Sequence, residues 1–151
     1  MSGASSIFKR PESVLLVIAT LGGEFLLLER TQPAGFWQSV TGSLEAGESP
    51  RQAAGRELRE ETGIRVPDAA LIDLRHRARF PIVPAWRARY APEVRENLEH
   101  WFALVLPFRR QISLNVQEHR QHGWLTARSA TFLASSWTNR QAIHLLATRL
   151  T

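Results

Sequence analysis

Short apolar runs bounded by glycine, proline and polar residues predict a series of β-strands in this chain. Residues 14–19 are predicted to form a buried strand, and residues 25–29 the returning strand after a turn at 21–24. We expect further strands or short extended elements at residues 37–41, 70–74, 100–106 and 124–125.

One helix is marked at both ends. Ser49 is a good N-cap, Pro50 suits the first helical position, and Gln52 follows the cap by three residues, which completes a capping box. Residues 51–62 continue the helix, and Gly63 is a natural C-cap. The sequence therefore predicts a helix that begins at Pro50 and ends before Gly63.

A second helix is predicted at residues 138–149, with Ser136 or Thr138 as its cap. Its apolar face consists of Ile143, Leu145, Leu146 and Leu150. Strands mixed with two helices indicate an α/β or α+β domain. Residues 75–99 carry prolines and several arginines, and we expect an irregular loop there.

The length of 151 residues fits a single domain that spans residues 1–151. The chain has no cysteine, which excludes disulfides and thiolate metal sites. No apolar run approaches the roughly 18 residues that cross a bilayer, so no membrane partner is expected. The run at 14–19 follows two basic residues, but a hairpin explains it better than a signal peptide, and we expect a cytoplasmic protein.

The formal charge is +5, and Lys9 is the only lysine among the basic residues. Arginine offers a planar fork to phosphate oxygens, and a basic balance suits a polyanionic small molecule or a nucleic acid. An arginine-rich composition without functional meaning explains the same numbers, so charge alone does not choose a partner.

Candidate chemistry gathers near the end of the first helix. Glu57, Glu60 and Glu61 stand at i, i+3 and i+4, so a helix projects them from one face within about 100° of each other. Like charges at this spacing repel, and a hard divalent cation would offset the repulsion; oxygen ligands favour Mg²⁺ or Mn²⁺ over zinc. The alternative is a solvated acidic helix end that pairs with Arg56 and Arg59.

The residues before these glutamates suit such a site. Arg56 can form a charge-assisted pair that orients a glutamate, and Glu48 can reach Arg56 or lie near the positive end of the helix. Gly42 and Gly47 allow a tight loop to pass close to a metal.

The complete pattern is more specific than its glutamates. From Gly42 it consists of a glycine, five residues, a glutamate, seven residues, and then Arg-Glu-aliphatic-x-Glu-Glu-x-Gly-aliphatic, which ends at Ile64. It resembles the Nudix box at every position, so the chain is similar to the Nudix hydrolase family. The resemblance implies an α/β fold, an α/β/α sandwich around a mixed β-sheet, and hydrolysis of a diphosphate linkage.

The resemblance also implies residue roles. Glu57 and Glu61 would be metal ligands, Glu60 a ligand or the catalytic base, and Arg56 the residue that orients them. Glu118 would supply a fourth metal-binding carboxylate, with a solvated loop glutamate as the alternative. Mg²⁺ is the expected cofactor, with Mn²⁺ as a substitute.

Similarity outside the box concerns residues 8–11, 36–42, 89–92, 100–102 and 137–143. They resemble the bacterial branch of the family that converts dihydroneopterin triphosphate to its monophosphate and pyrophosphate in folate biosynthesis. By this resemblance the substrate-binding residues would be Lys9, Arg30, Thr41, Phe80, Pro81, Ile82, Val83 and Ser136. The bland alternatives are surface cations for Lys9 and Arg30, loop anchors for Phe80 and Ile82, and a helix cap for Ser136.

Two other functions remain open. One is a house-cleaning Nudix enzyme that hydrolyses nucleoside triphosphates. The other is a non-catalytic RNA-binding or regulatory module, although such modules usually lose the box glutamates, and the arginines here lack the aromatic interleaving of single-strand binders. We therefore expect a small-molecule triphosphate substrate, no nucleic acid partner, and a monomer as one plausible assembly.

Overall fold

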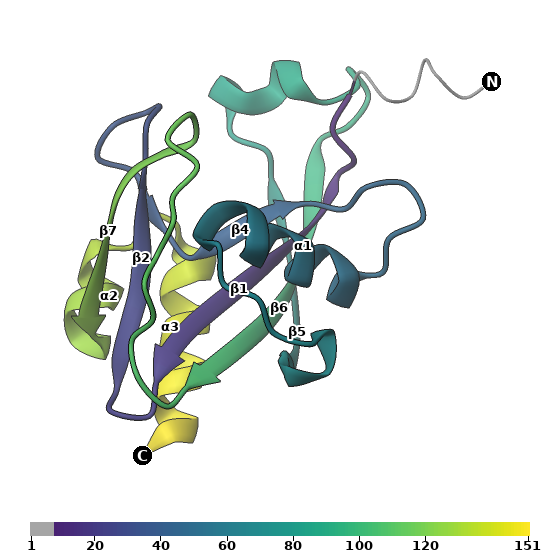
Figure 1. The fold of residues 1–151 in the computed structure, drawn as a ribbon. Helices are drawn as coiled ribbons and strands as arrows, with labels where there is room; N and C mark the ends of the chain where they lie inside the picture. The colour runs from purple at the N-terminus through teal and green to yellow at the C-terminus, as the bar shows by residue number, and fades with distance from the viewer. Residues whose placement is uncertain (1–7) are drawn as a thin grey trace.

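The computed structural model describes residues 8–151, which form a three-layer α/β/α sandwich (Figure 1). A seven-stranded sheet lies between helix α1 (Pro50–Thr62) and the helices α2 (Ala127–Leu133) and α3 (Trp137–Leu150). The strands are β1 (Glu12–Thr20), β2 (Glu24–Arg30), β3 (Trp37–Gln38), β4 (Val40–Ser43), β5 (Ile72–Pro81), β6 (Glu96–Leu106) and β7 (His119–Thr126). Two 3-10 helices, η2 (Asp68–Ala70) and η3 (Pro84–Arg89), flank β5. The predicted fold class is confirmed.

Strand β1 organises the sheet. It pairs in parallel with β6 along its whole length, from Glu12 opposite Leu98 to Thr20 opposite Leu106. It also pairs antiparallel with β4 near its beginning and with β2 near its end, so the sheet is mixed. Strand β7 extends the sheet from β2, and β5 forms an edge beside β6.

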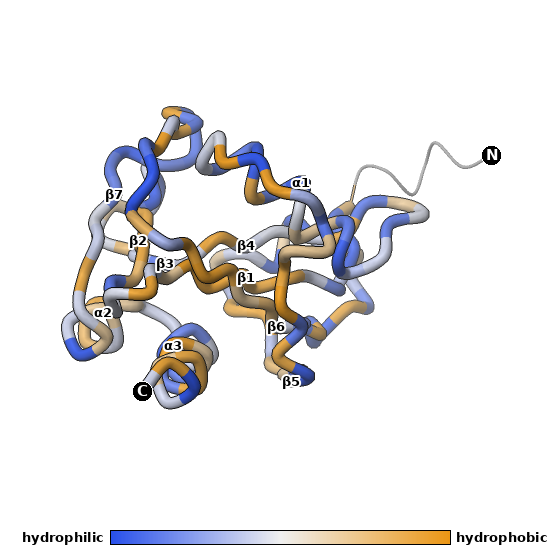
Figure 2. Tube along the Cα trace, turned by 60° about the horizontal axis from the view of Figure 1, so that its bottom comes forward, coloured by the Kyte–Doolittle hydropathy of each residue, from blue (hydrophilic) through white to orange (hydrophobic). Residues whose placement is uncertain are grey.

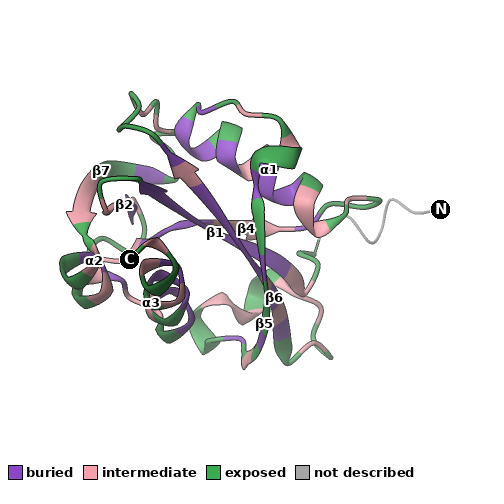
Figure 3. Cartoon of the chain, turned by 90° about the horizontal axis from the view of Figure 1, so that it is seen from below, coloured by how far each residue is buried: buried purple, intermediate pink, exposed green. Residues whose placement is uncertain are grey.

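The apolar residues of β1 alternate between two cores, because successive side chains of a strand point to opposite faces. Figure 2 shows the apolar sheet with α1 on one side and α2 and α3 on the other, and Figure 3 shows β1 buried between them. The α1 side contains Val14, Leu16, Ile18 and Leu58, whereas the α3 side contains Leu15, Val17, Ala19 and Ile143. An uninterrupted apolar strand therefore requires helices on both faces.

The ends of α1 match the sequence prediction. The hydroxyl of Ser49 accepts a hydrogen bond from the backbone of Gln52, and the Gln52 side chain accepts one from the backbone of Ser49. Gly63 adopts a left-handed conformation with φ of 77° and ends the helix. These caps fix where the box helix begins and ends.

The expected irregular loop at 75–99 is wrong in part, because β5 extends to Pro81 and β6 begins at Glu96. On this edge strand only Leu74 and Ala78 are buried, so its arginines face solvent without penalty. A bulge between Asp73 and Arg77 breaks the pairing with β6, and Arg75 takes a positive φ of 57°. The bulge interrupts the two-residue period that would have predicted the strand.

Three other elements differ from the prediction. Residues 37–41 form two strands rather than one, because the backbone N–H of Ser39 donates to the Asn139 side chain. Strand β7 is longer than the apolar pair at 124–125 that indicated it. Helix α2 was not predicted, since Ala130 is its only buried residue and it has little apolar pattern.

Asn139 connects α3 to the segment that leads into the box. Its Oδ1 accepts from the Ser39 backbone at 2.7 Å, and its Nδ2 donates to the Ser39 hydroxyl at 2.9 Å. Both residues are 1% exposed. The side chain of Asn139 therefore satisfies polar groups at the point where β3 ends and β4 begins.

We expect Asn139→Ala to lower the free energy of unfolding by about 2–4 kcal/mol, because it leaves buried groups of Ser39 without partners. Urea denaturation measures the change. Gln141→Ala, at an exposed position of the same helix, is the matched control and should stay within about 0.5 kcal/mol of the parent. Equal stability of the two variants would contradict the assigned role of Asn139.

Candidate active site

The box runs from the end of β4 through a loop into α1, next to the start of β1. The backbone N–H of Leu44 donates to the carbonyl of Glu12, which ties the box loop to β1. Gly42 lies against the side chain of Glu57, and a Cβ at Gly42 would lie only 1.7 Å from the Oε2 of Glu57. The glycine is therefore required by close approach of the strand to the box helix.

Arg56 binds the loop to the helix. Its Nε and Nη2 donate to the two carboxylate oxygens of Glu48 at 2.6 and 2.9 Å, and Nη2 also donates to the carbonyl of Ser43. Its Nη1 lies 3.2 Å from a carboxylate oxygen of both Glu57 and Glu60. Hydrogen bonding to Glu48 raises the pKa of Arg56 further above its already high value, so the residue is a permanent cation. Arg56 is thus placed to orient the glutamates, as the sequence suggests.

Glu57 and Glu61 form a buried carboxylate pair. Their side chains are 12% and 3% exposed. Burial raises the pKa of Glu57, partly opposed by Arg56, and burial together with the charge of Glu57 raises the pKa of Glu61. Two adjacent buried carboxylates repel each other, so the charged form of each is disfavoured.

Glu60 differs from this pair in its exposure. It is hydrogen-bonded to Arg56, and its side chain is 53% exposed. Nη1 of Arg56 lies 3.2 Å from a carboxylate oxygen of both Glu57 and Glu60, and the charge of Glu60 raises the pKa of Glu57. Glu60 therefore lies near Glu57, on the more exposed side of the cluster.

Glu118 approaches the buried pair from a different part of the chain. It lies just before β7, and its carbonyl accepts a hydrogen bond from the backbone of Thr31. Its charge acts on Glu61 and raises the pKa of that carboxyl. The fold thus brings Glu118 into electrostatic range of the box.

Three cations lie around these carboxylates. The pKa of Lys9 is lowered, first because the surrounding protein excludes water and then because Arg89 is cationic; Glu57 and Glu118 oppose this effect. The pKa of Arg30 is lowered by burial and by Arg89, while Glu61 and Glu118 oppose the change. Lys9 and Arg30 therefore lie within electrostatic range of these carboxylates, and Arg89 lies within electrostatic range of both cations.

His119 and Gln38 are site residues that the sequence did not indicate. The Nε2 of His119 lies 3.2 Å from the Gln38 amide nitrogen and 4.0 Å from Glu61 Oε1. Burial, followed by the charge of Arg30, lowers the pKa of His119 to about 4, so the ring is neutral at pH 7. Only its position directly after Glu118 could have drawn attention to it.

The other expected substrate residues have structural contacts of their own. The hydroxyl of Thr41 donates to the carbonyl of Val14, and the backbone N–H of Thr41 acts to lower the pKa of Glu61. Phe80 packs on the core on the α3 side of the sheet, and Pro81 ends β5. Ile82 is buried and donates its backbone N–H to the carbonyl of Arg95, whereas the exposed Val83 precedes η3. Ser136 caps α3 through Asn139. Of this set, Thr41 influences the pKa of the carboxylate pair.

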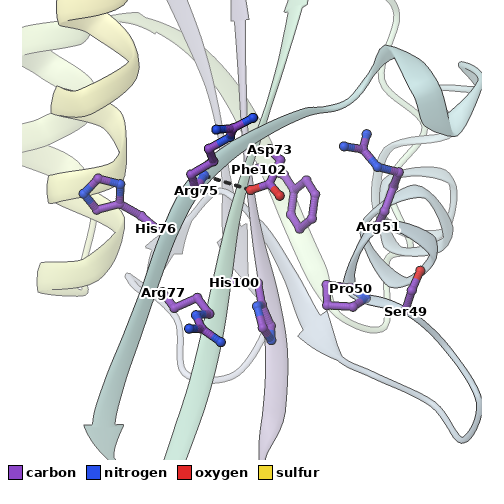
Figure 4. A pocket seen from close by; sticks show the side chains of 9 residues that line it. All are labelled: Ser49, Pro50, Arg51, Asp73, Arg75, His76, Arg77, His100 and Phe102. Atoms are coloured by element: carbon purple, nitrogen blue, oxygen red, sulfur yellow. Dashed lines mark hydrogen bonds between the residues drawn. The ribbon is translucent and has the colours of Figure 1, made fainter.

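A cavity of about 490 Å³ lies elsewhere, between the start of α1 and the bulge of β5 (Figure 4). Arg51, in its wall, donates to the carbonyls of Asp68 and Leu71, and His100 is paired with Glu12. These polar groups already have structural partners. None of the box glutamates lines the cavity, so it is separate from the carboxylate site.

The chemistry of the carboxylate site fits a divalent cation. Oε1 of Glu61 is buried and has no hydrogen-bond partner within residues 8–151, and Glu57, Glu61 and Glu118 offer only oxygen donors. In that same part of the chain no three His, Asp or Glu side chains are arranged so that together they could hold a metal ion. A cation there would offset the repulsion between the Glu57 and Glu61 carboxylates.

Buried carboxylates beside a cationic cluster are suited to bind a metal ion and the phosphates of a substrate. The family model described as "NUDIX domain" matches residues 9–146, and the chain belongs to the Nudix hydrolase family. Members of this family act on small-molecule phosphate substrates and generally use divalent metal ions.

Two relatives and one solved structure cover nearly the whole chain. The dihydroneopterin triphosphate diphosphatase of Escherichia coli (strain K12) is 47% identical over 91% of this chain and 92% of its own length. The enzyme of the same name from Haemophilus influenzae is 35% identical over 90% and 87%. The structure of the E. coli dihydroneopterin triphosphate pyrophosphohydrolase aligns with a TM-score of 0.88 and 44% identity, covering 95% of this chain and 99% of that one.

Within residues 8–151, none of the helices has the length and apolar character that would be needed to cross a bilayer.

We expect Gly42→Ala to lower the hydrolase kcat at least about tenfold, because the new Cβ must displace the carboxylate of Glu57. Steady-state kinetics and circular dichroism measure activity and folding. Gly22→Ala is the control, since its Cβ would meet only the Thr20 hydroxyl at 3.7 Å. If Gly42→Ala turned over at the parental rate, the close approach of β4 and α1 would not matter for activity.

Proposed function

We propose that this chain hydrolyses dihydroneopterin triphosphate to dihydroneopterin monophosphate and pyrophosphate, with Mg²⁺ as cofactor, in folate biosynthesis. The near full-length similarity to enzymes named for this substrate carries the choice of substrate. The buried Glu57–Glu61 pair beside Lys9 and Arg30 supports the reaction type. The substrate is then a small molecule rather than a nucleic acid, and we propose a cytoplasmic, monomeric enzyme.

Glu57, Glu61 and Glu118 are the proposed Mg²⁺ ligands, with Glu60 as a further ligand or the base. Their oxygen donors suit Mg²⁺, and Mn²⁺ shares this preference. When bound, Mg²⁺ supplies neutralisation of phosphate charge and lowers the pKa of its water.

Arg56 and Glu60 have complementary proposed roles. Arg56 holds the carboxylates of Glu48, Glu57 and Glu60 through direct contacts, so it positions the residues around the reacting phosphorus. Glu60 is the most exposed of the box-helix glutamates, so its carboxylate would receive a proton from water while Arg56 holds it in place. The choice between ligand and base for Glu60 follows from whether its loss alters Mg²⁺ affinity or only kcat.

Lys9 and Arg30 are proposed to hold the triphosphate, because both are cations beside the carboxylates. Thr41 lies beside Glu61 and would border the reacting phosphate. Residues 80–83 and Ser136 would border the pterin, which needs an apolar slot with a few polar groups.

A substrate panel tests the proposal. Dihydroneopterin triphosphate, the common (d)NTPs and oxidised purine nucleotides are assayed with phosphate and pyrophosphate measured separately. We expect the pterin to have the highest kcat/KM and to release pyrophosphate. A higher kcat/KM for any nucleotide would make the chain a house-cleaning enzyme, and no turnover of any compound would favour a regulatory module.

Loss of a metal ligand gives a second prediction. We expect Mg²⁺ to raise the Tm of the parent protein, since a ligand that binds only the folded state stabilises it. Glu61→Gln should abolish hydrolysis and the Mg²⁺-induced rise in Tm while the protein remains folded. Glu118→Gln should slow hydrolysis at least about tenfold and raise the Mg²⁺ requirement.

The control for these variants is Glu24→Gln. Glu24 lies at the start of β2, and the substitution removes its exposed ion pair with Arg109. It should keep the parental rate and Mg²⁺ response, since exposed pairs contribute little. A parental rate and Mg²⁺ dependence in Glu118→Gln would remove that residue from the metal site. Unchanged turnover in Glu61→Gln would rule out the box as the active site.

A further inference from the structure

Trp86 of η3 is the centre of an aromatic and cationic cluster beside the carboxylate site. The ring of Phe36 meets it edge-on, with centroids 5.4 Å apart and an interplanar angle of 67°. The guanidinium carbons of Arg30 and Arg89 lie over the Trp86 ring, 5.3 and 5.8 Å from its centroid. One indole thus contacts two cations that belong to distant segments of the chain.

Two guanidinium groups so close to one ring repel each other. The repulsion is evident in the lowered pKa of Arg30, to which burial contributes first and Arg89 second. The negative face of an indole attracts cations, so Trp86 offsets part of this repulsion. The arrangement keeps two cations together that would otherwise separate.

Backbone hydrogen bonds hold the cluster next to the carboxylate site. The N–H of Lys9 donates to the carbonyl of Arg89 at 2.8 Å, and the N–H of Thr31 donates to the carbonyl of Glu118 at 2.8 Å. Nε of Arg30 donates to the carbonyl of Gln32, which fixes its direction. η3, β2 and the segment before β1 therefore meet beside Glu118.

The ring of Trp86 is not a free stacking surface. Both guanidinium groups already lie over it, and Phe36 covers an edge. A pterin stacked on the same face of the ring would compete with these cations. The cluster is better suited to phosphate oxygens, which a guanidinium binds through its planar fork while its face stays on an aromatic ring.

We propose that Trp86 is a positioning residue for the triphosphate, holding Arg30 and Arg89 as a pair that binds the phosphates opposite the carboxylate site, with Arg89 as a further substrate-binding residue. This inference rests on the proposed function only in that the substrate carries a triphosphate. Recognition of the pterin is assigned to other residues.

The test uses two probes on the full-length protein in Mg²⁺ buffer. Inorganic tripolyphosphate has the phosphates without the ring, and neopterin has the ring without phosphates. In Trp86→Leu we expect the Kd for tripolyphosphate to rise about tenfold, while the Kd for neopterin stays within about twofold. KM for the triphosphate substrate should rise similarly with kcat within about threefold, as for lost uniform binding.

Further variants separate positioning from a general structural role. Trp86→Phe keeps an aromatic face and should restore tripolyphosphate binding to within about threefold of the parent. Arg89→Met, an exposed position, should weaken tripolyphosphate about tenfold, and the double variant with Trp86→Leu should be weakened by less than the product of the two effects. Arg87→Met removes the same charge from the same 3-10 helix and should stay within about twofold.

Several outcomes would overturn the inference. They are unchanged tripolyphosphate binding in Trp86→Leu or Arg89→Met, a loss of neopterin binding instead, multiplicative effects in the double variant, or an equal loss in Arg87→Met. Failure of the proposed function is distinguishable from these outcomes. If the substrate panel favours a nucleoside triphosphate, the tripolyphosphate measurements still decide the role of Trp86.

Discussion

The burial of two adjacent carboxylates, Glu57 and Glu61, is the constraint on which the rest of the site depends. Buried like charges are tolerated only with a proton, a cation or several hydrogen-bond donors nearby. The fold provides the backbone N–H of Thr41, the guanidinium of Arg56 and the cations around Lys9. Such an arrangement has no stabilising purpose by itself, and a divalent metal explains why it is present.

The central strand determines where that constraint is met. β1 holds β4 on one part of its length and β6 on the whole of it, so the box glycine and the box helix lie over the middle of the sheet. Asn139 fixes the Ser39 turn that leads into β4. The positions of the box glutamates thus follow from packing on both faces of one strand.

Much of this could be predicted from the sequence, because local signals were strong where they existed. The capping box at Ser49, the glycine after α1 and the apolar run of β1 identify their elements, and the box pattern identifies the family. β5 was largely missed because its bulge breaks the strand period, and α2 because it buries little. Helix periodicity groups Glu60 with Glu57 and Glu61, but it does not indicate that Glu60 is exposed while the other two are buried. Arg89, Trp86 and His119 come together only through long-range folding, which no local pattern reports.

The parallel pairing of β1 with β6 also has a consequence for how the protein forms. Glu12 meets Leu98 in the sheet, although most of the chain lies between them. Contacts between such distant segments slow folding, because a long loop must close before the pairing stabilises it. The box helix is complete early in synthesis, yet its apolar face has no finished sheet to cover until β6 emerges. A nascent chain with an intact catalytic motif therefore remains without a catalytic site, and it exposes the unpaired edge of its most apolar strand for most of translation.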